Sequence, residues 1–378
     1  MRIAVLAERA PGESRVAISP ETVKKFIALG GDWAVTVAVE RGAGIAAAVT
    51  DDALREAGAE IGDAAGVVKE ADIVLGVVAP DPALLTGAKP GAWVAATFDP
   101  FREPARVDAY AAAGLEALAM EFMPRITRAQ SMDVLSSQAN LAGYKAVIAA
   151  ADTYGRAFPM MMTAAGTVQA AKCFVMGVGV AGLQAIATAK RLGAQVSATD
   201  VRSATKEQIQ SLGAKPIFVE SVAGIEGEGA GGYATEMSEE YQKAQAELVS
   251  GHIAKQDIVI TTALIPGRPA PRLISDAQIA SMKPGSVIYD LAVAQGGNVE
   301  GSVADQVIEK HGVKIVGYAN TAAHLAADAS ALYARNLYNF LSAFWDKEAG
   351  KPVLDEEIGD AVRLTRGGEV VNEKLARN

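Results

Sequence analysis

The sequence predicts an α/β protein made of two Rossmann-like, doubly wound domains with mainly parallel sheets, separated by a cleft. Three observations support this fold class. The chain has 378 residues, whereas single hydrophobic cores stop growing at roughly 250 residues. Short apolar segments alternate with helical segments, and a glycine-rich turn follows one apolar segment in the second half. We expect one domain to comprise residues 1–135 and 328–378, and a Rossmann NAD-binding domain to comprise residues 136–327.

The first domain is predicted to contain a parallel sheet with crossover helices, because its apolar segments alternate with helical ones. Its first helix has clear limits. Ser19 is a favourable N-cap, Pro20 suits the first helical position, and Gly30 can end the helix. The predicted strands are Ile3–Leu6, Ala34–Val39, Ile73–Val78, Trp93–Thr97 and Leu115–Ala119.

The second domain is predicted to follow a long helix, from about Ala129 to Tyr154, and a Met-rich connection at 158–166. Six strand-like segments then suit a doubly wound nucleotide-binding sheet. They are Cys173–Gly177, Gln195–Thr199, Pro216–Val219, Asp257–Thr261, Ser286–Asp290 and Lys314–Tyr318. After them, Asp328–Trp345 has apolar residues at helical spacing, so we expect it to return the chain to the first domain.

Composition excludes several classes of protein. Half of the residues are hydrophobic and 21% are charged, which is typical of a globular protein. No segment has the roughly 18 uninterrupted apolar residues of a membrane-spanning helix, and the first residues lack a signal-peptide pattern. A net charge of -9 without a basic run argues against nucleic acid as a partner. Cys173, the single cysteine, is expected in a buried strand, and no metal-ligand spacing is present.

A dinucleotide-binding fingerprint runs from Gly177 to Gly182, between a predicted strand and a predicted helix. Gly177 would permit the tight turn, Gly179 would let the pyrophosphate approach the backbone, and Gly182 would let helix and strand pack closely. The next strand ends in Asp200, 18 residues beyond Gly182, which is near the spacing of a carboxylate that binds ribose hydroxyls. These residues predict NAD(H) and not NADP(H), although a tight turn without a ligand is the structural alternative.

Arg202 leaves two interpretations open, because it follows Asp200 by two residues. An arginine there could accept the 2′-phosphate of NADP(H). It could instead orient Asp200 or contact a phosphate or ribose of NAD, and we favour this second interpretation.

A second polar motif runs from Met123 to Gln138. If the helix starts near Ala129, Gln130, Asp133 and Ser137 lie near one face, and Asp133 is a neighbour of Ser136. Gln130 offers a donor and an acceptor suited to a carboxamide such as that of nicotinamide, and Arg125 could pair with Asp133. A capped and salt-bridged helix start without a ligand is the alternative.

The sequence offers no obvious group for proton transfer, which the oxidation of an alcohol or an amine usually requires. Its three histidines, His252, His311 and His324, are expected to be structural or solvated. Hydride transfer between two nicotinamides needs no general acid or base, only two rings held in contact.

With these motifs the sequence closely resembles the NAD(H)-binding component, domain I, of proton-translocating transhydrogenases, over nearly the whole chain. Gln169 and the segment Thr321–His324 depart from the family pattern, which puts only the local loops in doubt. The motifs that carry the resemblance are Arg15–Glu21, Pro124–Ile126 through Ser137, Thr163–Val168, the glycine fingerprint, Gly231–Ala234 and Thr261–Gly267.

The resemblance implies roles for individual residues. Arg125, Gln130, Asp133 and Ser136 are similar to the family's polar set around the nicotinamide, where they would act by positioning the ring. The resemblance also implies a set of cofactor-binding residues, which adds Arg128, Gly177, Gly179, Val180, Gly182, Asp200, Arg202, Leu264 and a mobile loop with Gly232 and Tyr233.

The resemblance also extends to alanine dehydrogenases, which are the alternative family. Those enzymes carry a substrate-binding lysine where this chain has Leu75–Pro80, and a catalytic histidine where it has Thr97–Pro100. Both groups are absent here. A third alternative is an NAD-binding protein without a catalytic partner.

For the whole assembly, the resemblance implies a homodimer that works with two kinds of partner subunit. One binds NADP(H) and the other spans the membrane and conducts protons. It further implies a cytoplasmic protein, peripheral on the cytoplasmic face of the bacterial inner membrane.

Overall fold

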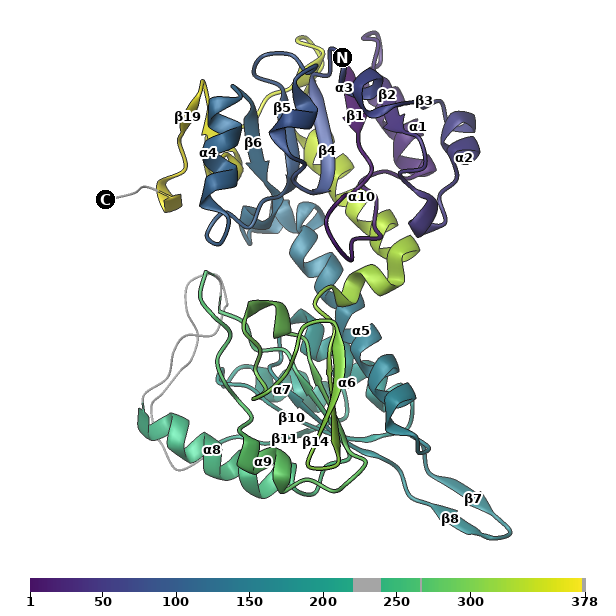
Figure 1. Cartoon of the computed structure of the whole chain (residues 1–378), viewed down its shortest axis with the longest axis vertical. Coiled ribbons are helices and arrows are strands. Elements are labelled where there is room, and N and C mark those ends of the chain that lie inside the picture. The colour runs from purple at the N-terminus through teal and green to yellow at the C-terminus, as the bar shows by residue number, and fades with distance from the viewer. Residues whose placement is uncertain (220–238, 266, 376–378) are drawn as a thin grey trace. The chain divides into compact units, whose positions relative to one another are not determined.

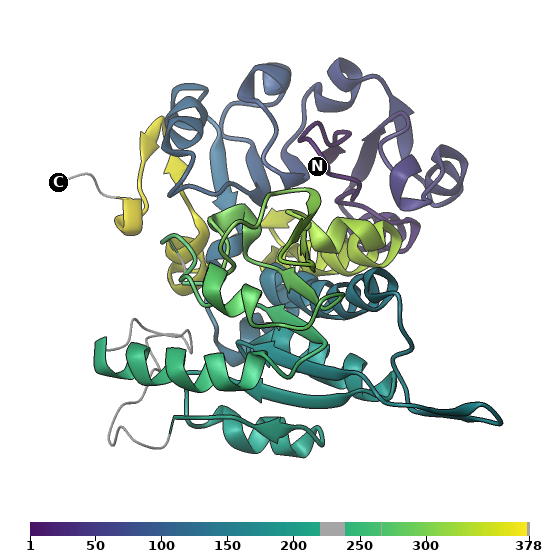
Figure 2. The same ribbon diagram turned by 60° about the horizontal axis from the view of Figure 1, so that its bottom comes forward.

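The computed structural model describes residues 1–219, 239–265 and 267–375 of the chain. The chain divides into two compact units, here called unit 1 (Met1–Gln138 and Ala323–Asn378) and unit 2 (Ala139–Ala322). Each unit contains one large sheet with helices packed against it (Figure 1 and Figure 2). The predicted α/β class with mainly parallel sheets is therefore confirmed.

Unit 1 has a six-stranded parallel sheet in the order β3-β2-β1-β4-β5-β6. Five of these strands were predicted. The sixth, β3, was not, because it has only three residues, ends in glycine and has no fully buried side chain. The strands are β1 (Arg2–Val5), β2 (Thr36–Glu40), β3 (Glu60–Gly62), β4 (Ile73–Val78), β5 (Trp93–Thr97) and β6 (Glu116–Ala119).

The first helix of unit 1, α1 (Pro20–Leu29), has the predicted limits. Ser19 caps it through a capping box with Thr22, Pro20 is its first residue, and it ends before Gly30. The other α-helices that follow in this part of the chain are α2 (Asp51–Glu56), α3 (Ala64–Val68) and α4 (Pro104–Ala112), and the 3₁₀ helices are η1 (Ile45–Ala47), η2 (Pro82–Leu85), η3 (Met120–Phe122) and η4 (Thr127–Met132).

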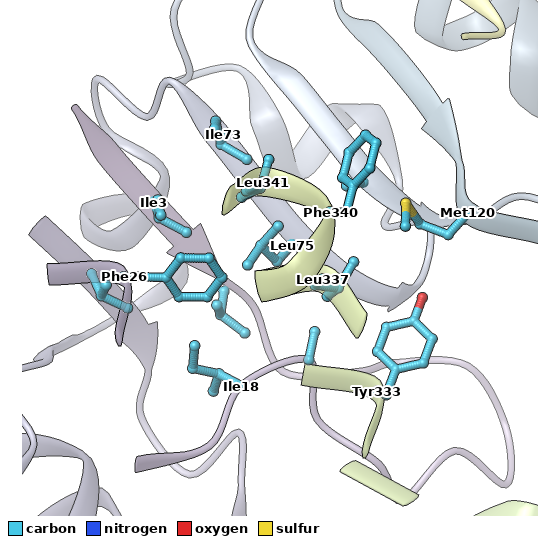
Figure 3. Packing of buried hydrophobic residues seen from close by; sticks show 14 of the residues in the cluster. Ile3, Ile18, Phe26, Ile73, Leu75, Met120, Tyr333, Leu337, Phe340 and Leu341 are labelled. Atoms are coloured by element: carbon cyan, nitrogen blue, oxygen red, sulfur yellow. The ribbon is translucent and has the colours of Figure 1, made fainter. Parts of the chain in front are cut away.

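Helix α10 (Ala326–Ala343) returns the chain to unit 1, as predicted from its apolar spacing. Its side chains Leu337, Phe340 and Leu341 are fully buried, and Figure 3 shows them beside Ile73 and Leu75 of β4. Burying a large apolar side chain contributes roughly 1.5–3 kcal/mol, so this helix completes the core of unit 1. The chain then forms β16 (Trp345–Asp346), β17 (Lys351–Pro352), α11 (Glu356–Val362), β18 (Thr365–Arg366), β19 (Glu369–Val370) and η8 (Glu373–Leu375).

Unit 2 has a seven-stranded sheet in the order β11-β10-β9-β12-β13-β15-β14, in which only β14 is antiparallel to its neighbour. This edge strand was not predicted, because Gln, Glu and Lys occupy three of its five positions and none of its side chains is fully buried. The strands are β9 (Lys172–Met176), β10 (Gln195–Thr199), β11 (Lys215–Pro216), β12 (Ile258–Thr261), β13 (Val287–Asp290), β14 (Gln306–Lys310) and β15 (Val313–Gly317).

An exposed antiparallel hairpin, β7 (Met161–Thr163) and β8 (Gly166–Val168), takes the place of the predicted connection, and both views show it projecting from unit 2. Cys173 is buried in β9, as expected. In the described ranges, no helix is both long and apolar enough to span a bilayer. The helices are α5 (Val134–Tyr154), α6 (Val180–Arg191), α7 (Thr205–Ser211), α8 (Glu239–Ile253), α9 (Asp276–Ala280), η6 (Val293–Gln295) and η7 (Thr321–Leu325).

Candidate functional site

The glycine fingerprint forms the turn between β9 and α6, and each of its three glycines has a different local reason. Gly177 has a φ of +97°, and a Cβ there would lie 2.6 Å from Thr262 Oγ1. A Cβ on Gly182 would lie 1.9 Å from the carbonyl oxygen of Gly177, so only glycine lets the helix pack on the turn. Gly179 faces open space, since a Cβ there would meet no atom within 4 Å. The turn therefore has an accessible backbone at its middle glycine.

Helix α6 begins directly after this turn without a capping side chain. Gly179 is its N-cap residue in extended conformation, and no side chain of the described residues accepts a hydrogen bond from the first helical turn. Gly179 and Val180 are exposed. The free N–H groups and the positive end of the helix dipole are favourable for a phosphate.

Asp200 lies at the end of β10, and four hydrogen bonds hold its buried carboxylate. Val178 N donates to Oδ2 at 2.6 Å, Arg202 N and Nε donate to Oδ1 at 2.9 Å each, and Arg202 Nη2 donates to Oδ2 at 2.9 Å. Burial raises the pKa of Asp200, but the hydrogen bonds from Arg202 and Val178 outweigh it, so the pKa lies below its ordinary value. The group is a carboxylate at neutral pH.

Arg202 thus orients Asp200, in line with the interpretation that we favoured from the sequence. A carboxylate offers about four acceptor positions, and all four are used in this arrangement. A ribose hydroxyl can therefore bind Asp200 only after the guanidinium of Arg202 gives up at least one of its bonds.

The residues after β12 form a further wall at the same edge of the sheet. Thr262 N donates to Met176 O at 2.9 Å, and Thr262 Oγ1 donates to Gly177 O at 3.0 Å. Leu264 follows them and is 37% exposed. Because β9 and β12 are adjacent and their crossovers run in opposite directions, this edge is the topological switch point at which doubly wound sheets bind ligands. Gly232 and Tyr233 lie outside the described residues.

The polar motif of unit 1 adopts a different structure from the one predicted. Residues 127–132 form the 3₁₀ helix η4, and the α-helix starts only at Val134. Asp133 is the reason, because its Oδ1 accepts from Ser136 N at 2.9 Å and its Oδ2 accepts from Ser136 Oγ at 2.5 Å. The expectation that Gln130, Asp133 and Ser137 share a helical face is therefore wrong, whereas Asp133 and Ser136 are neighbours as predicted. Gln130 and Arg125 are exposed.

Arg128 binds acidic residues of the C-terminal segment. Its Nη1 and Nη2 lie 2.6 Å from Asp355 Oδ2 and 2.6 Å from Glu357 Oε2. These carboxylates raise the pKa of Arg128 above its ordinary value. The predicted contact of Arg128 with a cofactor stays a prediction, and it would require this exposed side chain to exchange partners.

Two histidines have structural partners. His252 Nε2 lies 2.8 Å from Ser197 Oγ, and its ring packs edge-on against Phe174. Burial lowers the pKa of His252, and the nearby lysines Lys215, Lys255 and Lys172 lower it further. His311 Nε2 lies 2.9 Å from Asp276 Oδ1. Within the described part of the chain, no group of three His, Cys, Asp or Glu side chains is arranged to hold a metal ion.

Sequence reasoning missed two side chains that shape the edge of unit 2. Thr262 bonds the first glycine of the fingerprint, and Asn298 bonds Ala263, the residue next to Thr262. The only signal for Asn298 was its place after Gly296 and Gly297, a pair that indicates a turn and not a contact with another loop.

Comparisons with known proteins cover both units. The model of the alanine dehydrogenase/PNT N-terminal domain matches residues 4–142, and that of the C-terminal domain matches residues 146–373. An NAD(P) transhydrogenase alpha subunit of Rhodospirillum rubrum is 53% identical over 386 residues, with 99% of each chain covered. The crystal structure of transhydrogenase from Sinorhizobium meliloti superposes with a TM-score of 0.86 at 52% identity, covering 99% of this chain and 100% of that one.

Similarity to an alanine dehydrogenase is weaker. The alanine dehydrogenase of Mycobacterium tuberculosis is 29% identical over 307 residues, which cover 80% of this chain and 75% of that enzyme. The resemblance inferred from the motifs is confirmed: the chain belongs to the alanine dehydrogenase/PNT family, and within it is more similar to the NAD(P) transhydrogenase alpha subunits than to this alanine dehydrogenase.

Proposed function

We propose that this chain binds NAD(H) at the carboxyl edge of the unit 2 sheet and is the NAD(H)-binding subunit of a proton-translocating transhydrogenase. One observation carries the nucleotide part of the proposal. The exposed Gly179 turn, the uncapped start of α6 and the ionised Asp200 meet at the switch point of one sheet. The 53% identity to a transhydrogenase alpha subunit supports the reaction.

The residues of unit 2 fit the groups of NAD(H). The N–H groups of Gly179, Val180 and Ala181 would hold the pyrophosphate at the start of α6. Asp200 would accept hydrogen bonds from ribose hydroxyls after Arg202 turns aside, and its negative charge would repel the 2′-phosphate of NADP(H). Leu264, with Gly232 and Tyr233, would cover the bound nucleotide.

The nicotinamide of the bound cofactor supplies the hydride chemistry, in which NADH becomes NAD⁺ while NADP⁺ on a partner becomes NADPH. No proton has to be moved by a side chain in this step. Arg125, Gln130, Asp133 and Ser136 would act by positioning the ring, a role that can supply several powers of ten in rate. The bond between Asp133 and Ser136 would hold two of them in place.

The partners follow from the resemblance. The chain would act as a homodimer with an NADP(H)-binding subunit and a proton-conducting membrane subunit, on the cytoplasmic face of the bacterial inner membrane.

The proposal is tested by nucleotide binding to the isolated chain, followed by an exchange assay with a purified NADP(H)-binding transhydrogenase component. We expect NADH to bind at least about tenfold more tightly than NADPH, since a missing or misplaced charged contact costs roughly 1.5–3 kcal/mol. We also expect hydride exchange with the partner and no turnover of alanine with NAD⁺. Alanine oxidation would favour the dehydrogenase alternative, and NADH binding without any exchange would favour an NAD-binding protein of another role.

A further inference from the structure

Asn298 is a fully buried residue that ties together two ends of the segment between β12 and α9. Its Oδ1 accepts from Ala263 N at 3.1 Å, and its Nδ2 donates to Ala263 O at 2.9 Å. The same Nδ2 donates to Pro271 O at 2.8 Å. The backbone carbonyl of Asn298 accepts from Leu273 N at 2.8 Å and from Ile274 N at 3.0 Å. One side chain thus satisfies both backbone groups of Ala263.

Asn298 is itself held in place by Asp290 at the end of β13. Its backbone N–H donates to Asp290 Oδ1 at 3.2 Å, and the same buried carboxylate accepts from Ala292 N at 3.0 Å and from Val299 N at 3.2 Å. Gly297 has a φ of +76°, and a Cβ there would lie 2.7 Å from Asp290 Oδ2. The approach of this turn to Asp290 therefore requires glycine, and it leaves Asn298 little freedom.

What Asn298 holds lies directly against the glycine turn. A Cβ on Gly177 would lie 3.1 Å from Ala263 N, the atom that donates to Asn298. Thr262, the preceding residue, donates its hydroxyl to Gly177 O at 3.0 Å. Leu264 follows Ala263 and is partly exposed at the same edge of the sheet. Asn298 can therefore affect this edge through Ala263 without facing a ligand.

We propose that Asn298 is a positioning residue that fixes Ala263 and Leu264 as the wall for the nicotinamide half of the bound dinucleotide. This inference rests on the proposed function. In a doubly wound sheet the strands on either side of the switch point belong to two mononucleotide-binding halves, and β12 and β13 belong to the half opposite the glycine turn and Asp200. The adenosine and pyrophosphate groups supply most of the affinity in this scheme, so a displaced wall lowers the rate more than the affinity.

The variant that tests this is Asn298→Asp. It keeps the size of the side chain and one acceptor for Ala263 N, but it replaces the Nδ2 donor by an acceptor that faces Ala263 O and Pro271 O. Asn372→Asp is the matched control. Asn372 is also buried, and its Nδ2 donates to three carbonyl oxygens of unit 1, those of Asp360, Ala361 and Arg363.

We expect both variants to melt at lower temperature than the parent chain. Only Asn298→Asp is expected to speed hydrogen–deuterium exchange at the amide of Ala263 in the nucleotide-free chain. With the NADP(H)-binding component and saturating NADH, its hydride exchange should fall about 10- to 100-fold, which is the size of effect that a small ring displacement produces. Its Kd for NADH should stay within about fivefold of the parent value, and Asn372→Asp should leave rate and Kd unchanged.

The inference is wrong if Asn298→Asp melts earlier but keeps the parent Ala263 exchange and the parent rate, because Asn298 is then only structural. If Asn298→Asp does not fold, Asn298→Ser replaces it, since a hydroxyl can still donate one bond and accept one. It should show a smaller loss of rate in the same direction. If the parent chain itself neither binds NADH nor exchanges hydride, the proposed function fails, and the inference falls with it.

Discussion

The sheets of the two units share a strand order but treat their carboxyl edges differently. Unit 1 runs β3-β2-β1-β4-β5-β6, and the first six strands of unit 2 run in the corresponding order, β11-β10-β9-β12-β13-β15. In unit 2 the turn after the first strand is short and rich in glycine, and the helix after it has no side-chain cap. In unit 1 the turn after the first strand is long and carries the acids Glu8 and Glu13.

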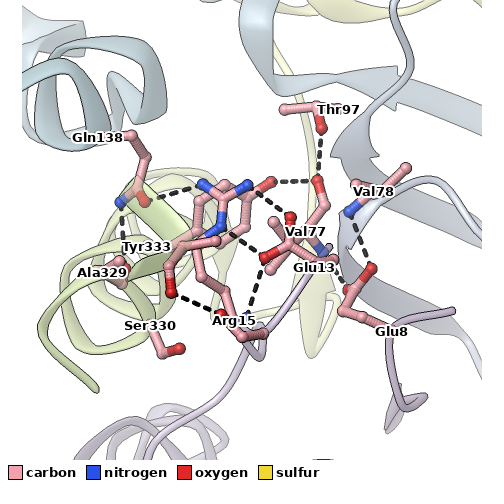
Figure 4. Close-up of polar contacts among 12 residues, drawn as sticks. Glu8, Glu13, Arg15, Val77, Val78, Thr97, Gln138, Ala329, Ser330 and Tyr333 are labelled. Carbon is pink, nitrogen blue, oxygen red and sulfur yellow. Dashed lines mark hydrogen bonds and ion pairs between the residues drawn. The ribbon is translucent and has the colours of Figure 1, made fainter. Parts of the chain in front are cut away.

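These acids and their neighbours satisfy the backbone at the edge of unit 1, as Figure 4 shows. Glu8 accepts from Val77 N at 2.6 Å and from Val78 N at 3.2 Å. Tyr333 donates to Val77 O at 3.2 Å, and Thr97 Oγ1 donates to the same oxygen at 2.5 Å. Backbone groups that could receive a ligand at this edge are thus bonded within the protein.

Arg15 and Glu13 extend this network of unit 1. The Arg15 guanidinium lies 2.7 Å from Glu13 Oε2 and donates to Gln138 Oε1 at 2.9 Å. Burial lowers the pKa of Arg15, but the hydrogen bond and the charge of Glu13 raise it above its ordinary value. The comparison teaches that the strand order provides an edge, whereas local side chains decide whether its donors and acceptors bond the protein or an outside group. Three predictions test this, in order of their expected effect on NADH binding.

The largest effect is expected from Gly179→Ala. A Cβ there meets no protein atom within 4 Å, so the variant should fold and melt like the parent chain. The new methyl group would stand where the pyrophosphate is to approach the backbone. We expect the affinity for NADH, measured by calorimetric titration, to fall at least about 100-fold, since a misplaced or lost set of charge-assisted contacts costs about 3 kcal/mol or more.

Gly182→Ala is the contrasting variant. Its Cβ would lie 1.9 Å from Gly177 O, so the helix or the turn must shift, which typically costs about 1–3 kcal/mol of stability. We expect Gly182→Ala to lose stability and affinity together, whereas Gly179→Ala loses affinity alone. Normal NADH binding by Gly179→Ala would remove the glycine turn from the site.

A smaller effect is expected from Asp200→Asn. The amide keeps the shape of the carboxylate, but it loses the charge that binds Arg202 and repels a 2′-phosphate. A hydrogen bond to a charged group contributes roughly 1.5–3 kcal/mol, so NADH binding should weaken about 10- to 100-fold. The preference for NADH over NADPH should shrink as well. Equal affinities and equal preference in parent and variant would exclude a contact between Asp200 and the ribose.

The sequence predicted the fold well where a pattern is local and strong. The buried strands β4 and β5, the capping box at Ser19 and the apolar face of α10 each have a short-range signal. The exposed strands β3 and β14 lack one, since neighbouring strands and not their own residues hold them in place.

The candidate site divides in the same way. The glycine turn and Asp200 could be predicted, because their residue types and spacing follow from the shape of a nucleotide. The start of α5 could not, because a single bond between Asp133 and Ser136 moved it. The pairing of Arg128 with Asp355 and Glu357 joins residues more than 220 positions apart, and no local pattern indicates such a contact.

The smallest effect on NADH binding is expected from Glu8→Gln, which changes the edge of unit 1. Burial raises the pKa of Glu8 from 4.5 to about 7, against the hydrogen bonds from Val77 and Val78, while the charge of Glu13 raises it further and that of Arg15 lowers it. The folded chain therefore binds a proton that the unfolded chain has lost. The stabilising contribution of Glu8 is fully present below about pH 4.5 and is lost as the pH rises through about 7.

Glutamine resembles the protonated acid and stays neutral, so it removes this part of the pH dependence. At pH 8 we expect Glu8→Gln to unfold with a free energy higher than that of the parent by up to about 3 kcal/mol, and to match the parent near pH 5. Urea unfolding from pH 5 to pH 8 measures this. Glu21→Gln is the control, since hydrogen bonds from Arg335 and Lys25 lower the pKa of Glu21 to about 2 and place its titration below this range. NADH binding should be unchanged in Glu8→Gln, because in the proposed scheme the nucleotide binds the edge whose backbone donors no side chain satisfies. Weaker NADH binding by this variant, at a pH where it is as stable as the parent, would show that the edge of unit 1 also takes part in binding the cofactor.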